Sequence, residues 1–249
     1  KIININIEEK PTGEIMAGAG AGTSGGTFLF GIKENNYLGK GLSVDANATV
    51  TSETFKGLFR VTNPNFNNSD KSLYTSLEAI EIDRLEKNGY KTNKTGFEFG
   101  TTFEYYNDFN LGFSTRSFYE KIDTDSTASA RQQSQEGNYW DSFFQFNFDY
   151  DKRNQKFRTD DGFRSNYSID IPIISDTYTL TNTYSYKYFT SFYENNISSL
   201  AIFLKSANSI GDKDIKLTER IFLPSRKLRG FERGKVGPKD GDDFIGGNF

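Results

Sequence analysis

Aromatic or apolar residues alternate with polar residues along much of the chain. Between Trp140 and Asp151 the even positions are mainly aromatic, and the odd positions are mainly polar or acidic. The segment from Phe97 to Tyr105 repeats this arrangement, as do residues 42–51 and 178–188. Because successive side chains point to opposite faces of a strand, the pattern predicts β-strands that each have one apolar and one polar face.

Such runs predict about eleven strands, each able to lie antiparallel to the next. They cover residues 14–22, 26–34, 41–51, 54–62, 71–84, 91–106, 108–121, 138–152, 162–171, 177–191 and 196–209. Some connections are tight, such as residues 23–25 and 107–108, whereas residues 123–137 form a long polar one. Short turns at one rim and long loops at the other are typical of outer-membrane β-barrels.

A soluble β-sandwich or barrel would alternate in the same way, because one face of each sheet meets the core and the other meets water. Two features favour a membrane barrel. Several strands are about 12 to 15 residues long, against about 5 to 6 in most sheets. Aromatic residues also gather near strand ends, as in interfacial girdles; these are Tyr105, Tyr106, Tyr119, Tyr139, Trp140 and Tyr150. The predicted fold class is all-β, an antiparallel transmembrane β-barrel.

The composition excludes several classes of protein. The 30 basic and 33 acidic residues give a net charge of −3, which argues against a basic nucleic-acid-binding face. Cysteine and histidine are absent, which removes disulfides, Cys/His zinc sites, and Ser-His or Cys-His nucleophile pairs. No stretch approaches the roughly 18 to 20 apolar residues of a membrane helix. We expect no enzymatic activity, no metal and no cofactor. Acidic residues on the polar faces are predicted to line a wet lumen; these are Glu98, Glu104, Asp141 and Asp149.

The first predicted strand differs from the others because it is made largely of alanine and glycine. Its residues offer almost no side chain for packing, and glycine weakens the interior of a strand. We therefore expect this strand to pair poorly and to be a place where a barrel could open, as a lateral gate. The alternative is close packing against another backbone. The candidate gate residues are Ile15, Ala17, Gly18, Ala19, Gly20, Ala21 and Gly22.

Three motifs follow one another near the C-terminus. They are Leu228-Arg229-Gly230-Phe231, then Val236-Gly237-Pro238-Lys239, then Gly246-Gly247-Asn248. In this order they resemble the long sixth extracellular loop of the BamA family of outer-membrane protein assembly factors, in the POTRA-containing bacterial surface antigen superfamily. The resemblance implies that residues of about 210–247 fold back into the lumen. There Arg229 would lie among acidic and aromatic residues of the wall, Gly230 would allow a bend, and Phe231 would supply apolar anchoring.

The N-terminal region also resembles this family. Residues 8–13 are similar to the exit from its last periplasmic POTRA domain, and residues 18–41 are similar to its first hairpin. Residues 1–10 would then be the end of the last POTRA domain, and residues 11–249 the N-terminal part of the barrel. Family barrels have about sixteen strands. The resemblance therefore implies an incomplete barrel and a fragment of a longer protein.

The function implied by the resemblance is insertion and folding of β-barrel proteins in the outer membrane of a Gram-negative bacterium. The implied partners are the lipid bilayer, unfolded outer-membrane protein clients and accessory assembly lipoproteins. Two alternatives remain. A secretion translocator of the two-partner type, from the same superfamily, would share the loop motif, and a passive porin would share only the alternation. An outer-membrane enzyme is the least favoured, because the familiar barrel proteases and phospholipases need a histidine.

Overall fold

We describe the protein from a computed structural model, and the structure describes residues 11–22, 25–85, 89–194, 196–223, 227–228, 230–231, 235–241 and 243–249. Residues 1–10, which we interpreted as the end of a POTRA domain, lie outside the described residues. Within the described part of the chain, eleven strands form one sheet in chain order, each antiparallel to the next. The strands are β1 (Gly13–Gly22), β2 (Gly25–Tyr37), β3 (Leu42–Thr51), β4 (Thr54–Asn63), β5 (Ser72–Arg84), β6 (Tyr90–Tyr106), β7 (Phe109–Thr124), β8 (Gly137–Asp151), β9 (Gly162–Ile174), β10 (Thr179–Tyr193) and β11 (Asn196–Ser209).

The predicted all-β antiparallel fold is confirmed, and the predicted strands differ from β1–β11 by only a few residues at their ends. Smaller elements lie in the connections. They are the 3₁₀ turn η1 (Phe66–Asn68), the short helix α2 (Ala130–Gln133), and the paired two-residue strands β12 (Lys239–Asp240) and β13 (Asp243–Phe244). Helix α2 begins at a capping box, in which Ser129 and Gln132 each satisfy the other's backbone N–H. No helix among the described residues is long and apolar enough to cross a bilayer.

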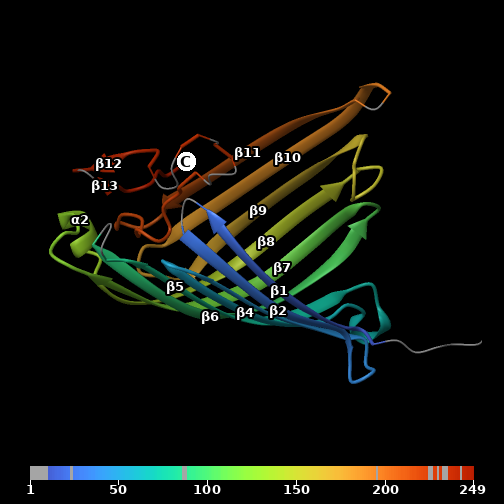
Figure 1. Cartoon of the computed structure of the whole chain (residues 1–249), viewed down its shortest axis with the longest axis horizontal. Coiled ribbons are helices and arrows are strands. Elements are labelled where there is room, and N and C mark those ends of the chain that lie inside the picture. Colours follow the sequence, from blue (N-terminus) through green and yellow to red (C-terminus); the bar gives the residue numbers. More distant parts are fainter. Residues whose placement is uncertain are drawn as a thin grey trace, which may run out of the picture.

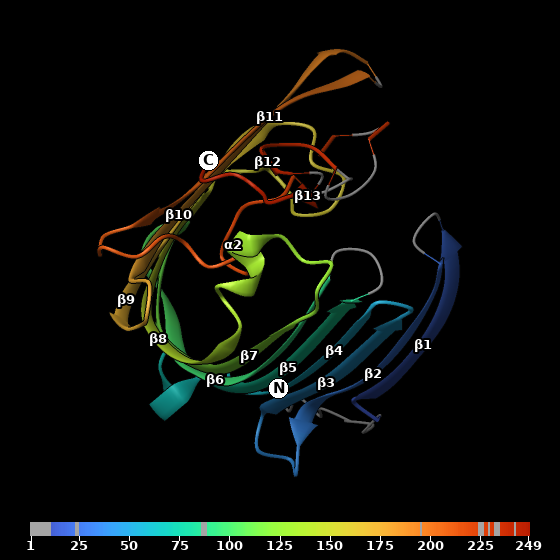
Figure 2. The ribbon, with the colours of Figure 1, turned by 90° about the vertical axis from the view of Figure 1, so that its left-hand side faces the viewer.

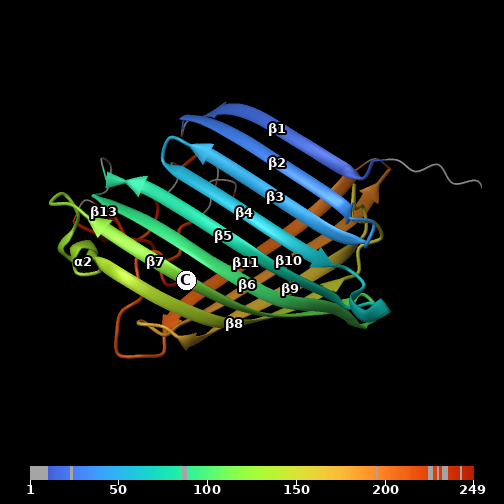
Figure 3. The same cartoon turned by 90° about the horizontal axis from the view of Figure 1, so that it is seen from below.

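The sheet curls into an open trough, and β1 and β11 are its two edge strands (Figure 1). Helix α2 and the segment after β11 lie on the concave side of this trough (Figure 2). Seen from below, the strands run side by side and obliquely across the convex side (Figure 3). We call the end of the trough at which the chain enters β1 the N-terminal rim, and the opposite end, which carries α2, the α2 rim.

The register between neighbouring strands shows which side chains share a face. Glu98 of β6 pairs with Arg116 of β7, and Phe97 pairs with Ser117. Glu120 and Asp141 bond to the segment on the concave side, so their positions define the concave face. Outward-facing apolar side chains are 45–64% exposed on the convex face; they include Phe28, Phe59, Leu77, Phe97, Phe99, Phe144 and Leu200. The concave face is therefore mainly polar and the convex face mainly apolar.

One predicted girdle residue was assigned to the wrong face. Tyr139 occupies an odd position in β8, like Asp141, and therefore faces the concave side. Its hydroxyl donates a hydrogen bond to the carbonyl of Gln135 at 2.7 Å. Its neighbour Trp140 pairs with Tyr119, and both are exposed on the convex side. The odd or even position of an aromatic residue in its strand decides whether its ring can reach the outer surface. Clustering of aromatic residues in the sequence does not.

The most buried apolar residues lie at the α2 rim of the concave side. They come from the wall, the loop that carries α2, and the segment after β11, and include Phe118, Ile122, Ala128, Phe143, Ile215, Leu217 and Ile245. Gly96 of β6 makes room for one of these rings, because a Cβ there would lie 2.2 Å from Cδ1 of Phe118. A small core therefore joins the wall to the C-terminal part of the chain.

Candidate functional site

The C-terminal segment, residues 210–249, begins where β11 ends at Ser209. Residues 214–220, which we call the docked segment, lie against the concave wall near the α2 rim. Ile215, Lys216 and Leu217 follow one another and are all buried. The backbone N–H of Leu217 donates a hydrogen bond to Oε1 of Gln135, in the loop that carries α2, at 2.6 Å. The docked segment thus packs between this loop and the wall.

Lys216 is the most buried charged side chain of the docked segment. Its Nζ lies 3.3 Å from Oε2 of Glu120 on β7 and forms a second ion pair with Asp141 on β8. The Lys216 side chain is 2% exposed and the two carboxylate side chains are each 1% exposed. The same Nζ lies 4.8 Å from the ring centroid of Tyr139. Lys216, Glu120 and Asp141 together form what we call the Lys216 cluster.

The electrostatic environment favours the charged form of Lys216. Burial by itself lowers the pKa of an ammonium group, but the surrounding carboxylates, chiefly Glu120, outweigh burial and raise the pKa of Lys216 above 10.5. Among the atoms that the structure describes, Oδ1 of Asp141 is buried without a hydrogen-bond partner. The cluster is therefore tightly enclosed and is held together by charge.

Two neighbouring residues extend these contacts to a third strand. The carboxylate oxygen Oε2 of Glu219 accepts hydrogen bonds from the hydroxyls of Thr177 and Thr179, at 2.9 and 2.6 Å. Thr218 donates a hydrogen bond to Glu120 at 3.0 Å. The docked segment is thus bonded to β7, to β8 and to the start of β10.

Asp214 connects the docked segment to α2. It pairs with Arg131 of α2, and it accepts hydrogen bonds from Arg220 at 2.9 and 3.0 Å. Burial raises the pKa of a carboxyl group, but the hydrogen bond from Arg131 and the charge of Arg220 outweigh it and hold the pKa of Asp214 below 3.8. Nearby, Lys213 pairs with Asp176 at 3.0 Å, but both of these side chains are more than half exposed.

The Leu-Arg-Gly-Phe motif is described only in part. Arg229 lies outside the described residues. Leu228 is half-buried, and Gly230 has a positive φ of 88°, which glycine adopts without strain. The side chain of Phe231 is 58% exposed. Docking of this motif in the lumen, with Arg229 against the wall and Phe231 as an anchor, stays a prediction.

The other two motifs lie in backbone pairings. The carbonyl of Pro238, next to Gly237, accepts a hydrogen bond from the N–H of Ile245 at 3.0 Å. Gly246 has φ of 74°, and Gly247 exchanges two 2.9 Å hydrogen bonds with Ile221.

The last of these residues reaches the edge of the sheet. The N–H of Ala207 on β11 donates a hydrogen bond to the carbonyl of Asn248 at 2.7 Å. The chain therefore returns to the β11 end of the sheet after the docked segment.

Strand β1 forms the opposite end of the sheet and contains all the candidate gate residues. Each of its ten residues pairs with β2, from Gly13 with Glu34 to Gly22 with Gly25. The expected poor pairing is not seen between β1 and β2. Glycine and alanine keep the backbone N–H and C=O groups that form the hydrogen bonds between strands. What they lack is side-chain packing. Among the described residues, β2 is the only strand beside β1.

Residues 36–249 match the model of the Omp85 superfamily domain. The chain belongs to the Omp85 superfamily. Its fold is similar to that of BamA from Haemophilus ducreyi lacking POTRA domains 1–3, with a TM-score of 0.83 and 20% sequence identity. That match covers 97% of this chain and 52% of the other, so this chain spans about half the length of the BamA chain. The expected resemblance to this barrel is confirmed at the level of the fold.

A second solved structure, CdiB from Acinetobacter baumannii, is similar in fold with a TM-score of 0.53 and 11% identity. The match covers 88% of this chain and 42% of CdiB. The Omp85 fold in this chain is thus shared with proteins of little sequence similarity.

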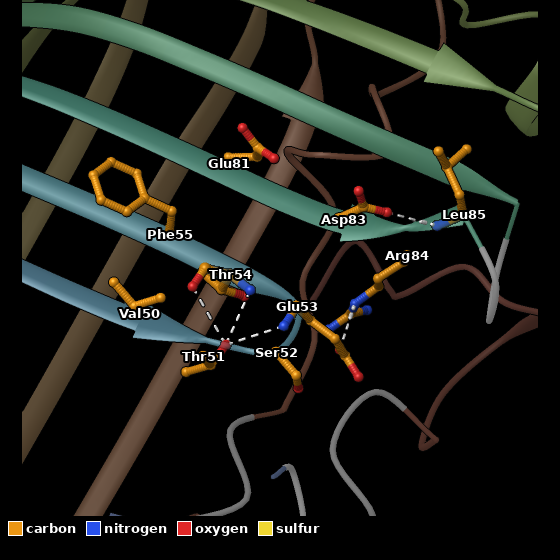
Figure 4. Close-up of a pocket in the computed structure, with 10 residues that line it drawn as sticks. All are labelled: Val50, Thr51, Ser52, Glu53, Thr54, Phe55, Glu81, Asp83, Arg84 and Leu85. Carbon is orange, nitrogen blue, oxygen red and sulfur yellow. Dashed lines mark hydrogen bonds and ion pairs between the residues drawn. The ribbon is translucent and has the colours of Figure 1, made fainter. Parts of the chain in front are cut away.

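A pocket of about 590 Å³ opens at the α2 rim of the Omp85 sheet, between the β3–β4 turn and the end of β5 (Figure 4). Thr51 Oγ1 accepts hydrogen bonds from the backbone N–H groups of Glu53 and Thr54, at 3.3 and 2.9 Å. Arg84 pairs with Glu53 at 3.7 Å. These contacts stabilise a hairpin turn, and none of the residues singled out from the sequence lines the pocket.

Lys216, Glu219 and Glu120 were not predicted from the sequence as site residues. Only Asp141 of the Lys216 cluster was predicted to face the lumen. Alternation in β7 would not have assigned Glu120 to the same face, because Phe118 and Ile122 share its parity, whereas Ser117 and Lys121 lie on the opposite face. Lys216 and Glu219 belong to no motif, and their contacts with the wall depend on how the Omp85 loop folds back onto it.

Proposed function

We propose that this Omp85 chain belongs to a barrel in the outer membrane of a Gram-negative bacterium that folds and inserts other β-barrel proteins. The observation that carries the proposal is the position of β1. It is a ten-residue strand at the end of the sheet, fully paired with β2 on one side and composed largely of alanine and glycine. Its other edge would form one side of a lateral gate, where it would template a strand of the client protein.

The physical basis is the need to satisfy backbone hydrogen bonds in hydrocarbon. Each unpaired N–H or C=O group there costs several kcal/mol. An extended client strand that pairs with the edge of an existing sheet meets this requirement as it enters the bilayer. On the convex side of β1 the side chains include Ala17, Ala19 and Ala21, which are small. A strand that pairs here would gain backbone bonds but little side-chain packing, so it could later be released.

Other parts of the proposal follow from the faces of the sheet and from the family. The exposed apolar convex face is suited to contact with lipid. Unfolded outer-membrane proteins and accessory assembly lipoproteins are the proposed protein partners. No bond is made or broken in such a process, so the proposed role is not enzymatic. We also propose that the Arg229 motif docks in the lumen; the position of the docked segment on the concave wall supports this placement.

Disulfide crosslinking in the full-length protein tests the gate. The chain contains no cysteine, so single cysteines at Ala17, Ala19 or Ala21 can be combined with a cysteine scan along the C-terminal strand of a client. The matched control is a cysteine at Ala48, which also faces outward but lies in β3 between two paired strands. We expect crosslinks at β1 that depend on register, and none at Ala48.

Equal crosslinking at Ala48 would show that contact is non-specific and would contradict the templating role. If β1 formed no crosslink, while a secreted polypeptide was trapped by a cysteine at the concave position Glu98, the protein would be a translocator of the same superfamily. A barrel that passed only small solutes and trapped neither kind of polypeptide would be a porin.

A further inference from the structure

We propose that Lys216 is a positioning residue that latches the docked segment onto the concave wall, as an anchor separate from the Arg229 motif. The latch is the Lys216 cluster, in which one ammonium group joins carboxylates on two neighbouring strands. The docking is independent of the proposed function.

The burial of the cluster makes the pairing obligatory. An ammonium group that is 2% exposed has lost nearly all of its contact with water, as have the carboxylates of Glu120 and Asp141 at 1% each. Removing a charge from water is unfavourable unless an opposite charge and hydrogen bonds replace the solvent. If the docked segment left the wall, Lys216 could be hydrated again, but Glu120 and Asp141 would lose their counter-ion. The three groups therefore stabilise one another only in the docked arrangement.

The geometry of the cluster also sets the position of the segment along the wall. Glu120 pairs in register with Tyr139, and Asp141 pairs with Phe118, so the two carboxylates are diagonal neighbours on β7 and β8. A single Nζ that contacts both can occupy only one place on the sheet. Ile215 and Leu217, on either side of Lys216, are buried in that place. The cluster thus specifies the register of the loop against the barrel, in addition to contributing to its stability.

The other contacts of the docked segment depend on this register. The bonds from Thr218 to Glu120 and from Thr179 to Glu219 lie within three residues of Lys216 along the segment. The ion pair of Asp214 with Arg131, two residues before Lys216, is roughly half exposed, so solvent weakens it. All the anchors named here lie on β7, β8, the start of β10 and the α2 loop. The latch therefore holds the loop on the side of the trough away from β1.

Hydrogen exchange of the full-length protein in lipid nanodiscs tests the latch, with residues 214–220 followed by mass spectrometry. In Lys216→Met, two buried carboxylates keep no counter-ion, and we expect exchange of these amides to become about 100-fold faster. The matched control is Lys213→Met, which removes an exposed lysine three residues before Lys216, just outside the docked segment. We expect this control to exchange like the wild type.

A rescue variant separates charge from packing. Adding Glu120→Gln and Asp141→Asn to Lys216→Met removes the uncompensated charges, and we expect it to restore most of the lost protection. Asp141→Asn alone is the milder variant, to be used if Lys216→Met fails to fold; we expect an intermediate increase in exchange. Wild-type exchange in Lys216→Met or in Asp141→Asn would overturn the proposal. Failure of the triple variant to recover protection would also overturn it, since the lysine would then act through packing.

The independence of this anchor from the Arg229 motif is tested by Arg229→Ala. We expect residues 214–220 to stay protected in that variant, and equal opening in Arg229→Ala and Lys216→Met would contradict a separate latch. These measurements involve no client protein. Failure of the hydrogen-exchange test would therefore leave the proposed lateral gate unaffected. Failure of the crosslinking test would likewise leave the proposed latch unaffected.

Discussion

The hydroxyl of Thr179, at the start of β10, donates a 2.6 Å hydrogen bond to the carboxylate of Glu219 in the C-terminal segment. Forty positions separate the two residues in the chain. The threonine is almost completely buried, so its hydroxyl has little access to water as an alternative partner. This bond joins the wall to the loop at a place where solvent cannot replace it.

Thr179→Val keeps the shape of the side chain but removes the donor. Hydrogen bonds to charged groups contribute about 1.5 to 3 kcal/mol, so we expect exchange of the amides around Glu219 to become at least about ten-fold faster. Thr181→Val, at the next inward-facing position of β10, is the control. Equal acceleration in the two variants would show that the effect comes from β10 as a whole.

Acid should loosen the docked segment through Asp214. Because the pKa of Asp214 in the folded protein is below the ordinary 3.8, the folded state binds fewer protons than the unfolded state in this range. The contribution of Asp214 is therefore fully present above pH 3.8 and is lost as the pH falls through the lowered pKa. Hydrogen exchange of residues 214–220 between pH 6 and pH 2, corrected for the intrinsic rate, measures this loss. In Asp214→Asn we expect the acid-dependent change to become smaller by the contribution of Asp214; an unchanged pH profile would contradict the assignment.

The two faces of β8 should respond differently to a new charge. Phe144 lies at the middle of β8 on the convex face, and Phe144→Arg is expected to lower the free energy of unfolding by about 2 to 4 kcal/mol in a bilayer. Asn147 lies on the concave face, where Asn166 donates a 3.0 Å hydrogen bond to it. Asn147→Arg should therefore lower the free energy of unfolding by only about 1 kcal/mol, which is the net contribution of such a hydrogen bond. Urea unfolding in lipid vesicles measures both, and equal losses would argue against a lipid-facing convex surface.

Gly96 is expected to resist even the smallest side chain. A Cβ at this position would lie 2.2 Å from the ring of Phe118 and 2.5 Å from the carbonyl oxygen of Ser117, so the wall would have to shift. Overpacking of this kind lowers the free energy of unfolding by about 1 to 3 kcal/mol. At Gly57 a Cβ would meet only Phe55, at 3.5 Å, so Gly57→Ala is the control. The same urea experiment should show no loss for Gly57→Ala, and a loss there equal to that of Gly96→Ala would point to strand entropy instead of packing.

The strands could be predicted from the sequence because alternation is a local property. Phe97, Glu98 and Phe99 already show which face of β6 is apolar, without knowledge of any other strand. The resemblance of the C-terminal motifs to the BamA family similarly placed a long loop after the last strand, where the structure has residues 210–249. Local patterns and ordered motifs were therefore sufficient for the architecture.

The contacts of the candidate site could not be predicted in this way. Lys216 and Glu120 are 96 positions apart, and their pairing depends on the β7–β8 register and on the path of the loop. In the sequence Lys216 resembles any solvated lysine. Tyr139 was assigned to a girdle because it precedes Trp140, although its odd position places it in the lumen, against that same lysine. Long-range charge pairing and the faces of strand ends are set by tertiary structure.

The alternation of faces also limits how such a chain can change in evolution. Deleting one residue inside β6 would turn Glu98 toward the lipid and Phe97 toward the water-filled lumen, because the side-chain period of a strand is two. The same holds for every strand of the sheet, so insertions and deletions should accumulate at the rims. Length differences among homologous chains are therefore expected in the turns and loops, while the strands keep their length and their parity.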